Sequence, residues 1–186
     1  MDKEIFNSTN MTHRWWKAMF LSSEKLKKEG IYPASTAQKA QLKRCSTIDD
    51  AMLSEGFRNL WLVLPDSIID KAKPQDIECW ATIAAALVYV KEDSEQNLAT
   101  AAAQKNSNEK SIVSELRFSQ LQNSKTPDEF LRRMRRILQQ IDGKTSVTTL
   151  INDIQQWFKE HYSFRTNSPA NRIAVRWAMD YYRAAK

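Results

Sequence analysis

The segment from Phe130 to Ile141 constrains the fold more than any other, because its apolar residues recur with a helical period. At about 100° per residue, six apolar side chains fall within roughly 120° of arc. They are Phe130, Leu131, Met134, Ile137, Leu138 and Ile141. The four arginines of the segment, Arg132, Arg133, Arg135 and Arg136, are expected on the opposite side. The pattern predicts a helix that packs by one face and holds a row of guanidinium groups out to solvent.

The rest of the chain favours helices as well. Only three glycines and five prolines occur in 186 residues, too few for a series of tight hairpins, whereas Ala, Leu, Glu, Lys, Gln and Arg are plentiful. A hydrophobic content of 42% and six tryptophans indicate a folded protein. We therefore predict an all-α protein, a helical bundle of two small lobes without a sheet. The lobes are expected at 1–95 and 96–186. The charged stretch 91–96, which lacks apolar residues, is expected to be a linker or an exposed loop.

Start and stop signals place the expected helices along the chain. Thr126-Pro127 with Glu129 is the strongest start signal, because it combines an N-cap residue, a first-turn proline and the third position of a capping box. Ser168-Pro169 resembles it. The expected helices cover 12–29, 35–45, a segment from 46 or 47 to about 63, 74–90, 98–104, 111–121, 127–141, 146–162 and a final helix from 168.

Positive charge is concentrated in the second half of the chain. Residues 111–186 hold 13 Lys and Arg against 7 Asp and Glu, whereas residues 1–110 are neutral. Arg172, Arg176 and Arg183 fall within roughly 40° of one another on the final helix, and Arg117 precedes the arginine-rich helix. These positions are expected to merge into one basic surface. A simpler explanation of any single arginine row is a helix face exposed to solvent without a ligand. Asp180 and Glu129 could form local ion pairs, but two carboxylates are too few to neutralise the arginines of both rows.

The sequence offers no support for catalysis. His13 and His161 are far apart and lack partners at metal-ligand spacing, and no phosphate-binding, zinc-protease or nucleophile-elbow motif occurs. Cys45 and Cys79 are predicted to be buried free thiols of a reducing compartment. The Trp15-Trp16 pair is more typical of a core than of a base-stacking platform. We expect no enzyme, cofactor or metal, and a cytoplasmic protein, since the longest apolar run is too short to span a bilayer and no secretory signal is present.

Five segments, in order, resemble one family. They are Ala37 to Cys45, Arg117 to Leu121, Leu131 to Leu138, Leu150 to Trp157 and Val175 to Tyr182. They are similar to the A-x-LRR, RF-x-x-L, LRRL-RLL, L-x-x-D-[LI]-x-x-W and R-x-WA-x-DYY segments of the CasB family, the small subunit of the type I-E CRISPR surveillance complex Cascade. The similarity extends from about Thr12 to the C-terminus.

The resemblance implies a non-catalytic, two-lobed helical subunit that pairs with a second copy and with other Cascade subunits. Its partners would be guide RNA and target DNA, held by their backbones to stabilise their pairing and the displaced strand in antiviral defence. Together with the exposed rows, it gives these nucleic-acid-binding candidates: Lys39, Lys43, Arg44, Arg117, Arg132, Arg135, Arg136, Arg172, Arg176 and Arg183. Lys43 departs from the family pattern, because it stands where the family usually has the first arginine of the segment. The lysine keeps the positive charge but lacks the bidentate fork of arginine.

A second function stays open from the sequence alone. The basic faces could dock an acidic protein partner, which would make the chain a stand-alone helical adaptor. Binding that retains one protein and rejects DNA and RNA would distinguish the adaptor from the Cascade subunit.

Overall fold

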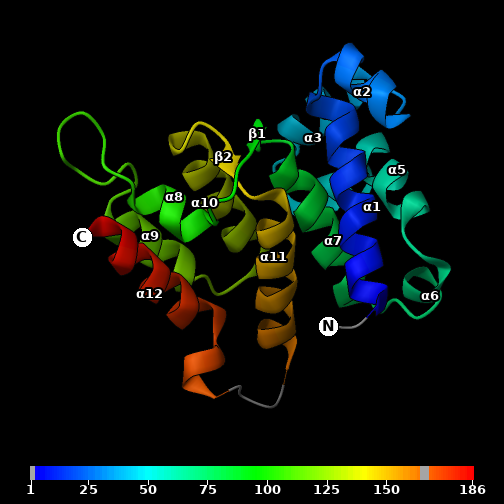
Figure 1. The fold of residues 1–186 in the computed structure, drawn as a ribbon. Helices are drawn as coiled ribbons and strands as arrows, with labels where there is room; N and C mark the ends of the chain where they lie inside the picture. Colours follow the sequence, from blue (N-terminus) through cyan, green and yellow to red (C-terminus); the bar gives the residue numbers. More distant parts are fainter. Residues whose placement is uncertain (1–2, 164–167) are drawn as a thin grey trace. The chain divides into compact units, whose positions relative to one another are not determined.

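The chain divides into two compact units, Met1–Val88 and Tyr89–Lys186 (Figure 1). The computed structural model describes residues 3–163 and 168–186, with side chains from residue 7 onward. Within those residues, twelve α-helices and one short 3-10 helix account for nearly all regular structure. The expected all-α fold is confirmed. The expectation of no sheet needs one correction, because two two-residue strands pair in the second unit.

The first unit consists of seven helices. They are α1 (Lys3–Phe20), α2 (Ser23–Glu29), α3 (Thr36–Arg44), α4 (Ile48–Met52), α5 (Glu55–Val63), α6 (Asp66–Ile69) and α7 (Pro74–Leu87). Two helices expected to be continuous are interrupted. Ser22 is extended between α1 and α2. Ser54 separates α4 from α5, and its Oγ accepts the Phe57 N–H at 3.1 Å. At Ser54 a hydrogen bond from the first turn of α5 to the serine side chain thus replaces the backbone hydrogen bonds of a continuous helix.

Helix α7 is the core element of the first unit. Every side chain from Cys79 to Leu87 is buried, and α7 packs against α3, α4 and α5. Trp15 and Trp16 are buried, as is typical of core tryptophans. Cys45 and Cys79 are buried free thiols, as predicted.

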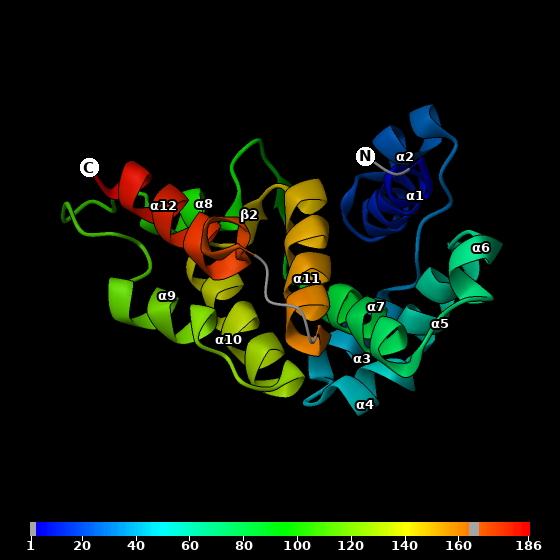
Figure 2. The same ribbon diagram turned by 90° about the horizontal axis from the view of Figure 1, so that it is seen from below.

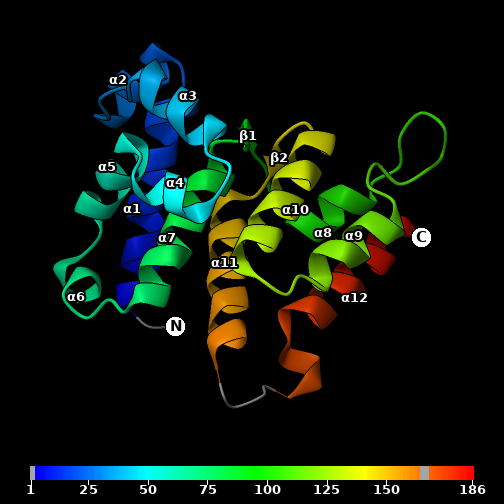
Figure 3. The same cartoon turned by 180° about the vertical axis from the view of Figure 1, so that it is seen from behind.

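The second unit contains five helices, a 3-10 turn and the two strands. Its elements are β1 (Glu92–Asp93), α8 (Leu98–Ala103), α9 (Glu115–Gln122), α10 (Pro127–Gln140), β2 (Lys144–Thr145), α11 (Val147–Tyr162), η1 (Pro169–Asn171) and α12 (Ile173–Ala185). Helix α12 lies along α8 (Figure 3). Three stacked rings tie α10, α11 and α12 together, since Phe130 lies 4.1 Å from Trp157 and 6.3 Å from Trp177 between ring centroids.

The stretch 91–96, most of which is exposed, contains one of the two short strands. Glu92 and Asp93 form β1, which pairs in parallel with Lys144 and Thr145 of β2. The turn before β2 requires a glycine at position 143 for two reasons. Its φ of 70° lies in the left-handed region, and a side chain there would place its Cβ 2.3 Å from the Tyr89 carbonyl oxygen. The Gly143 carbonyl accepts the Lys91 N–H at 2.9 Å. These backbone contacts attach the beginning of the second unit to the end of α10.

No helix in the described part of the chain, 3–163 and 168–186, has both the length and the hydrophobicity needed to cross a bilayer.

Candidate nucleic-acid interface

Helices α9 and α10 lie side by side (Figure 2). Side chains of both helices line a groove. The groove, which we call the arginine groove, encloses about 400 Å³. It is lined by Arg117, Gln120, Arg133, Arg136, Ile137, Gln139 and Gln140. Three cationic side chains and three amides thus share one hollow, a combination of donors suited to oxyanions.

Local sequence explains how α10 carries its part of the groove. Thr126 caps the helix by accepting the Glu129 N–H at 3.2 Å, as the start signal predicted. The predicted capping box differs from the observed one in its second half, because Glu129 does not bond the N-cap residue itself. The Glu129 carboxylate accepts the Lys125 N–H at 2.8 Å, one residue before the cap. That hydrogen bond, followed by the nearby positive charge of Arg133, lowers the pKa of Glu129. The carboxylate is therefore ionised beside the groove and forms a 2.5 Å ion pair with Arg133.

The three arginines of the groove differ in their availability. Arg133 is engaged within the fold, because it pairs with Glu129 and also donates to the Gln120 carbonyl and the Ser124 hydroxyl. Arg117 donates to the Gln140 amide oxygen at 3.1 Å, a neutral partner. Within the described residues, no ion pair joins Arg117 or Arg136 to a carboxylate, and both side chains are exposed. These two cations carry the charge that the groove can offer to a ligand.

The four arginines of α10 do not all lie on its outer face, as had been expected. Arg135 is 9% exposed, and its guanidinium lies 5.2 Å from the centroid of the Tyr89 ring. Arg132 and Arg136 are exposed. On a helical wheel, Arg133 and Arg135 lie only about 40° beyond the two edges of the apolar arc, whereas Arg132 and Arg136 lie opposite its centre. Neighbouring elements therefore cover the two boundary arginines.

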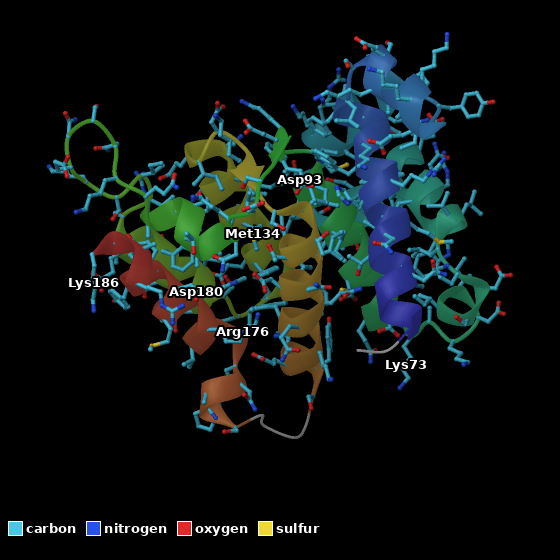
Figure 4. All side chains as sticks on the ribbon, in the orientation of Figure 1. Lys73, Asp93, Met134, Arg176, Asp180 and Lys186 are labelled. Atoms are coloured by element: carbon cyan, nitrogen blue, oxygen red, sulfur yellow. The ribbon has the colours of Figure 1, made fainter. Side chains whose placement is uncertain are left out.

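Arg176 and Arg183 of α12 lie on exposed positions, as their spacing predicted. The helix begins at Ile173 and not at Ser168 as expected, so Arg172 is the extended N-cap residue that precedes it. Arg172, Arg176 and Arg183 are all exposed, while Ile173, Trp177 and Tyr181 are buried on the opposite face. Figure 4 shows Arg176 and Asp180 following one another along this helix. Arg172 lines a separate hollow of about 370 Å³ together with Lys125, His161 and Trp157. The arginine rows of α10 and α12 are thus associated with two hollows, and the groove described above contains no residue of α12.

A buried carboxylate holds α12 to α11. Asp153 accepts a hydrogen bond from the Trp177 indole at 2.8 Å, and its other oxygen lies 3.5 Å from Arg176. Burial raises the pKa of Asp153 to about 6, although the Trp177 hydrogen bond and the Arg176 charge act in the opposite direction. Because Asp153 lies beside it, Arg176 is only partly available to a ligand, although its side chain is 53% exposed.

The basic residues expected in the first unit lie on α3. Lys43 and Arg44 are exposed, but Lys39 is half-buried and does not share their outer face. Its ammonium lies 3.4 Å from the centroid of the Phe20 ring and 3.3 Å from the Met19 carbonyl oxygen. Burial, followed by the positive charge of Lys43, lowers the pKa of Lys39.

Sequence reasoning missed the amides of the arginine groove. Gln120 follows Arg117 by three residues and Gln140 follows Arg136 by four, spacings that place each pair on one helix face. The signal was present, but only the packing of α9 against α10 brings the two faces together. Among the residues described, no group of three or more His, Cys, Asp or Glu side chains could hold a metal ion.

The structure is thus that of a small all-helical protein with an arginine- and amide-lined groove in its second unit. The profile of the family "CRISPR-associated protein Cse2" matches residues 38–182. The chain belongs to this family, and the resemblance to CasB drawn from its sequence is confirmed.

Two solved structures share the fold. A chain in the crystal structure of E. coli Cascade bound to a PAM-containing dsDNA target has a TM-score of 0.63 and 14% identity, covering 95% of this chain and 94% of that one. CasB from Thermus thermophilus has a TM-score of 0.58 and 20% identity, with coverage of 92% and 97%. No curated protein sequence matches this chain.

Proposed function

We propose that this protein is a non-catalytic subunit of a CRISPR Cascade complex and that it binds nucleic-acid backbone through the arginine groove. It would stabilise the pairing of guide RNA with target DNA and the displaced strand, as a cytoplasmic component of antiviral defence. Membership of the Cse2 family supports the subunit role, as does the fold shared with a chain of a DNA-bound Cascade. Its partners would be guide RNA, target DNA, the other Cascade subunits and a second copy of itself.

The arginine groove is the observation that carries this proposal. Arg117 and Arg136 extend from two different helices into one hollow, and neither is neutralised by a carboxylate within the described part of the chain. Guanidinium groups bind phosphate oxygens bidentately, and neighbouring amides add donors that do not depend on base identity. A groove of this kind holds a sugar-phosphate backbone without reading sequence. That property suits a complex in which base pairing with a guide selects the target.

Other exposed basic residues expected from the sequence are further candidates for backbone contacts. Arg132, Arg172, Arg176 and Arg183 belong to the second unit and would extend the interface there, whereas Lys43 and Arg44 belong to the first unit and would make contacts of their own. Arg135 and Lys39 are poorer candidates than the sequence suggested, because one is buried beside Tyr89 and the other lies over Phe20. We propose that contacts of Arg117 and Arg136 form the centre of the interface in the second unit and that contacts of Arg132, Arg172, Arg176 and Arg183 form its periphery.

The salt dependence of binding tests the proposal. Each neutralised phosphate contributes about 0.7 to the slope of log affinity against log salt for a single strand. The double variant Arg117→Gln with Arg136→Gln should therefore reduce the slope for a single-stranded oligonucleotide by about 1.4. Arg58→Gln is the matched control, since Arg58 is an exposed arginine of the first unit that donates a hydrogen bond to the Leu53 carbonyl.

Fluorescence anisotropy over a salt series measures both variants. A double variant with the slope of the wild type would remove the groove from the interface. If the wild-type chain retained an acidic protein but bound neither DNA nor RNA, the backbone-binding proposal would be replaced by that of an adaptor.

A further inference from the structure

The first unit has a second hollow, which is unrelated to the arginine groove. It encloses about 460 Å³ between α1, α5 and the extended segment that joins α2 to α3. Most of its surface is apolar, and Trp15, Ala18, Ile31 and Val63 are among the residues that line it. This volume lies within the range of cavities that take an organic ligand or a bulky side chain. We call it the Trp15 cavity.

The wall of the Trp15 cavity is fixed by backbone hydrogen bonds. Gly30 ends α2 in the left-handed conformation. The Ile31 N–H then donates to the Leu26 carbonyl at 2.9 Å, and the Ala34 N–H donates to the Ala18 carbonyl at 2.8 Å. The extended segment is thereby held against α1, and the cavity exists before any ligand binds. Preformed cavities bind with less loss of conformational entropy than surfaces that must first become ordered.

The aromatic residues of the cavity differ sharply in exposure. Trp15 is 8% exposed, whereas Tyr32 is 92% exposed although it also lines the hollow. Val63, the last residue of α5, also lines the cavity and is 45% exposed. Apolar surface thus continues from the cavity onto its rim, where a larger partner could cover it. An aromatic ring beside an open apolar hollow is typical of binding sites, since tyrosine gives much contact area at low entropic cost.

The charge of the lining favours an anionic partner. Of the described residues that line the Trp15 cavity, Arg14 alone carries a full charge at neutral pH, and no carboxylate is among them. The Arg14 guanidinium donates to the Gly30 carbonyl at 2.7 Å, which uses one of its five N–H donors and fixes the group at the rim. An occupant that combines an apolar side chain with a nearby carboxylate would satisfy both the cavity and its rim.

We propose that the Trp15 cavity binds an acidic segment of a partner protein, inserting one bulky apolar side chain and pairing a carboxylate with Arg14. Much of this site lies on residues that precede the family match at 38–182. None of its lining residues belongs to the arginine groove, so the two sites can be tested by separate variants. A peptide fits better than a free small molecule, because the apolar surface extends beyond the hollow to Tyr32 and Val63.

Two synthetic peptides test the proposal. The first is acetylated and amidated Glu-Glu-Leu-Phe-Glu, and the second has lysine in place of each glutamate. Titration into the isotope-labelled full chain, followed by amide chemical shifts, should perturb residues 11–35 with the acidic peptide. The lysine peptide should bind at least about tenfold more weakly, because repulsion by Arg14 replaces a charge-assisted hydrogen bond.

Variants distinguish insertion into the cavity from general attraction. Arg14→Gln should weaken binding of the acidic peptide about fivefold, the loss expected for one charge-assisted hydrogen bond at a rim. Ala18→Phe should abolish binding by filling the hollow. Val63→Glu, at a half-exposed position, tests the same site if the phenylalanine variant folds poorly. Arg58→Gln and Arg136→Gln are controls and should leave the affinity unchanged.

Equal binding of the acidic and lysine peptides, or unchanged affinity in both Arg14→Gln and Val63→Glu, would overturn the proposal. Loss of affinity in Arg136→Gln would also overturn it, by placing the peptide in the arginine groove.

Discussion

Protonation of Asp153 should make the stability of the second unit depend on pH in a direction opposite to that of most carboxylates. Burial raises the pKa of this group from 3.8 to about 6 in the folded protein. Between about pH 4 and pH 6 the native state therefore binds more protons than the unfolded state, so stability falls as pH rises. The difference between the two pKa values corresponds to about 3 kcal/mol, at about 1.4 kcal/mol for each tenfold change in the acid constant.

Asp153→Asn isolates this contribution. The asparagine amide oxygen can still accept the Trp177 indole N–H, but the side chain no longer titrates. The free energy of unfolding of the variant, relative to that of the wild type, should rise by about 3 kcal/mol between pH 4 and pH 7. Comparison with the wild type at each pH cancels the contributions of Asp50, Glu129 and Asp142, whose pKa values are lowered.

Urea denaturation at intervals across this pH range measures the difference, with Glu95→Gln, at an exposed carboxylate of the same unit, as control. The indole proton resonance of Trp177 should titrate in parallel, with a midpoint near pH 6 in the wild type and no transition in Asp153→Asn. A constant difference in stability between wild type and variant, or an indole midpoint near pH 4, would refute the assigned cause.

Two further predictions concern the packing of the second unit. Gly143→Ala should lower the free energy of unfolding by about 2–3 kcal/mol, because a left-handed residue would bring its Cβ against the Tyr89 carbonyl. Gly30→Ala, also left-handed but without any atom within 4 Å of the added Cβ, should cost only about 1 kcal/mol. Arg135→Glu should destabilise the protein by about 3 kcal/mol, because a carboxylate would replace a buried cation beside Tyr89. Arg136→Glu should change stability by less than about 0.5 kcal/mol, and chemical denaturation of the two arginine variants provides the comparison.

Helices were predicted best from the sequence where an N-cap signal and the helical periodicity of apolar residues indicated the same segment. Thr126 and Pro127 placed the start of α10 correctly, and its apolar arc identified the buried residues. The interruptions at Ser22 and Ser54 were missed, because helical periodicity continues across both positions while the structure breaks there. A serine that caps a new helix and a serine within one helix differ in backbone conformation, which tertiary packing decides. The strand pair was missed for a related reason, since two-residue strands leave no alternation to detect.

The candidate site was less predictable than the fold, because it depends on contacts between helices. Spacing placed Arg136 on the outer face of its helix, and the family resemblance made Arg117 a candidate, but only the packing of α9 on α10 places both in one groove. Spacing also assigned Arg135 to the solvent face, although its position at the edge of the apolar arc left its environment to neighbouring segments. Tyr89, which covers it, precedes it by 46 residues. No periodicity within α10 could have revealed that contact.

Asp153 connects the folding of the second unit to its proposed interface. The same carboxylate accepts the Trp177 indole and lies 3.5 Å from Arg176, so one buried group positions a core residue and an interface candidate on α12. Two of the segments that resemble the CasB family, Leu150 to Trp157 and Val175 to Tyr182, meet at this contact. The two segments depend on each other because the arginines of α12 can contact a ligand only if the helix is held in one orientation about its axis. A buried hydrogen bond fixes that rotation more specifically than apolar packing, since it is satisfied in one geometry only.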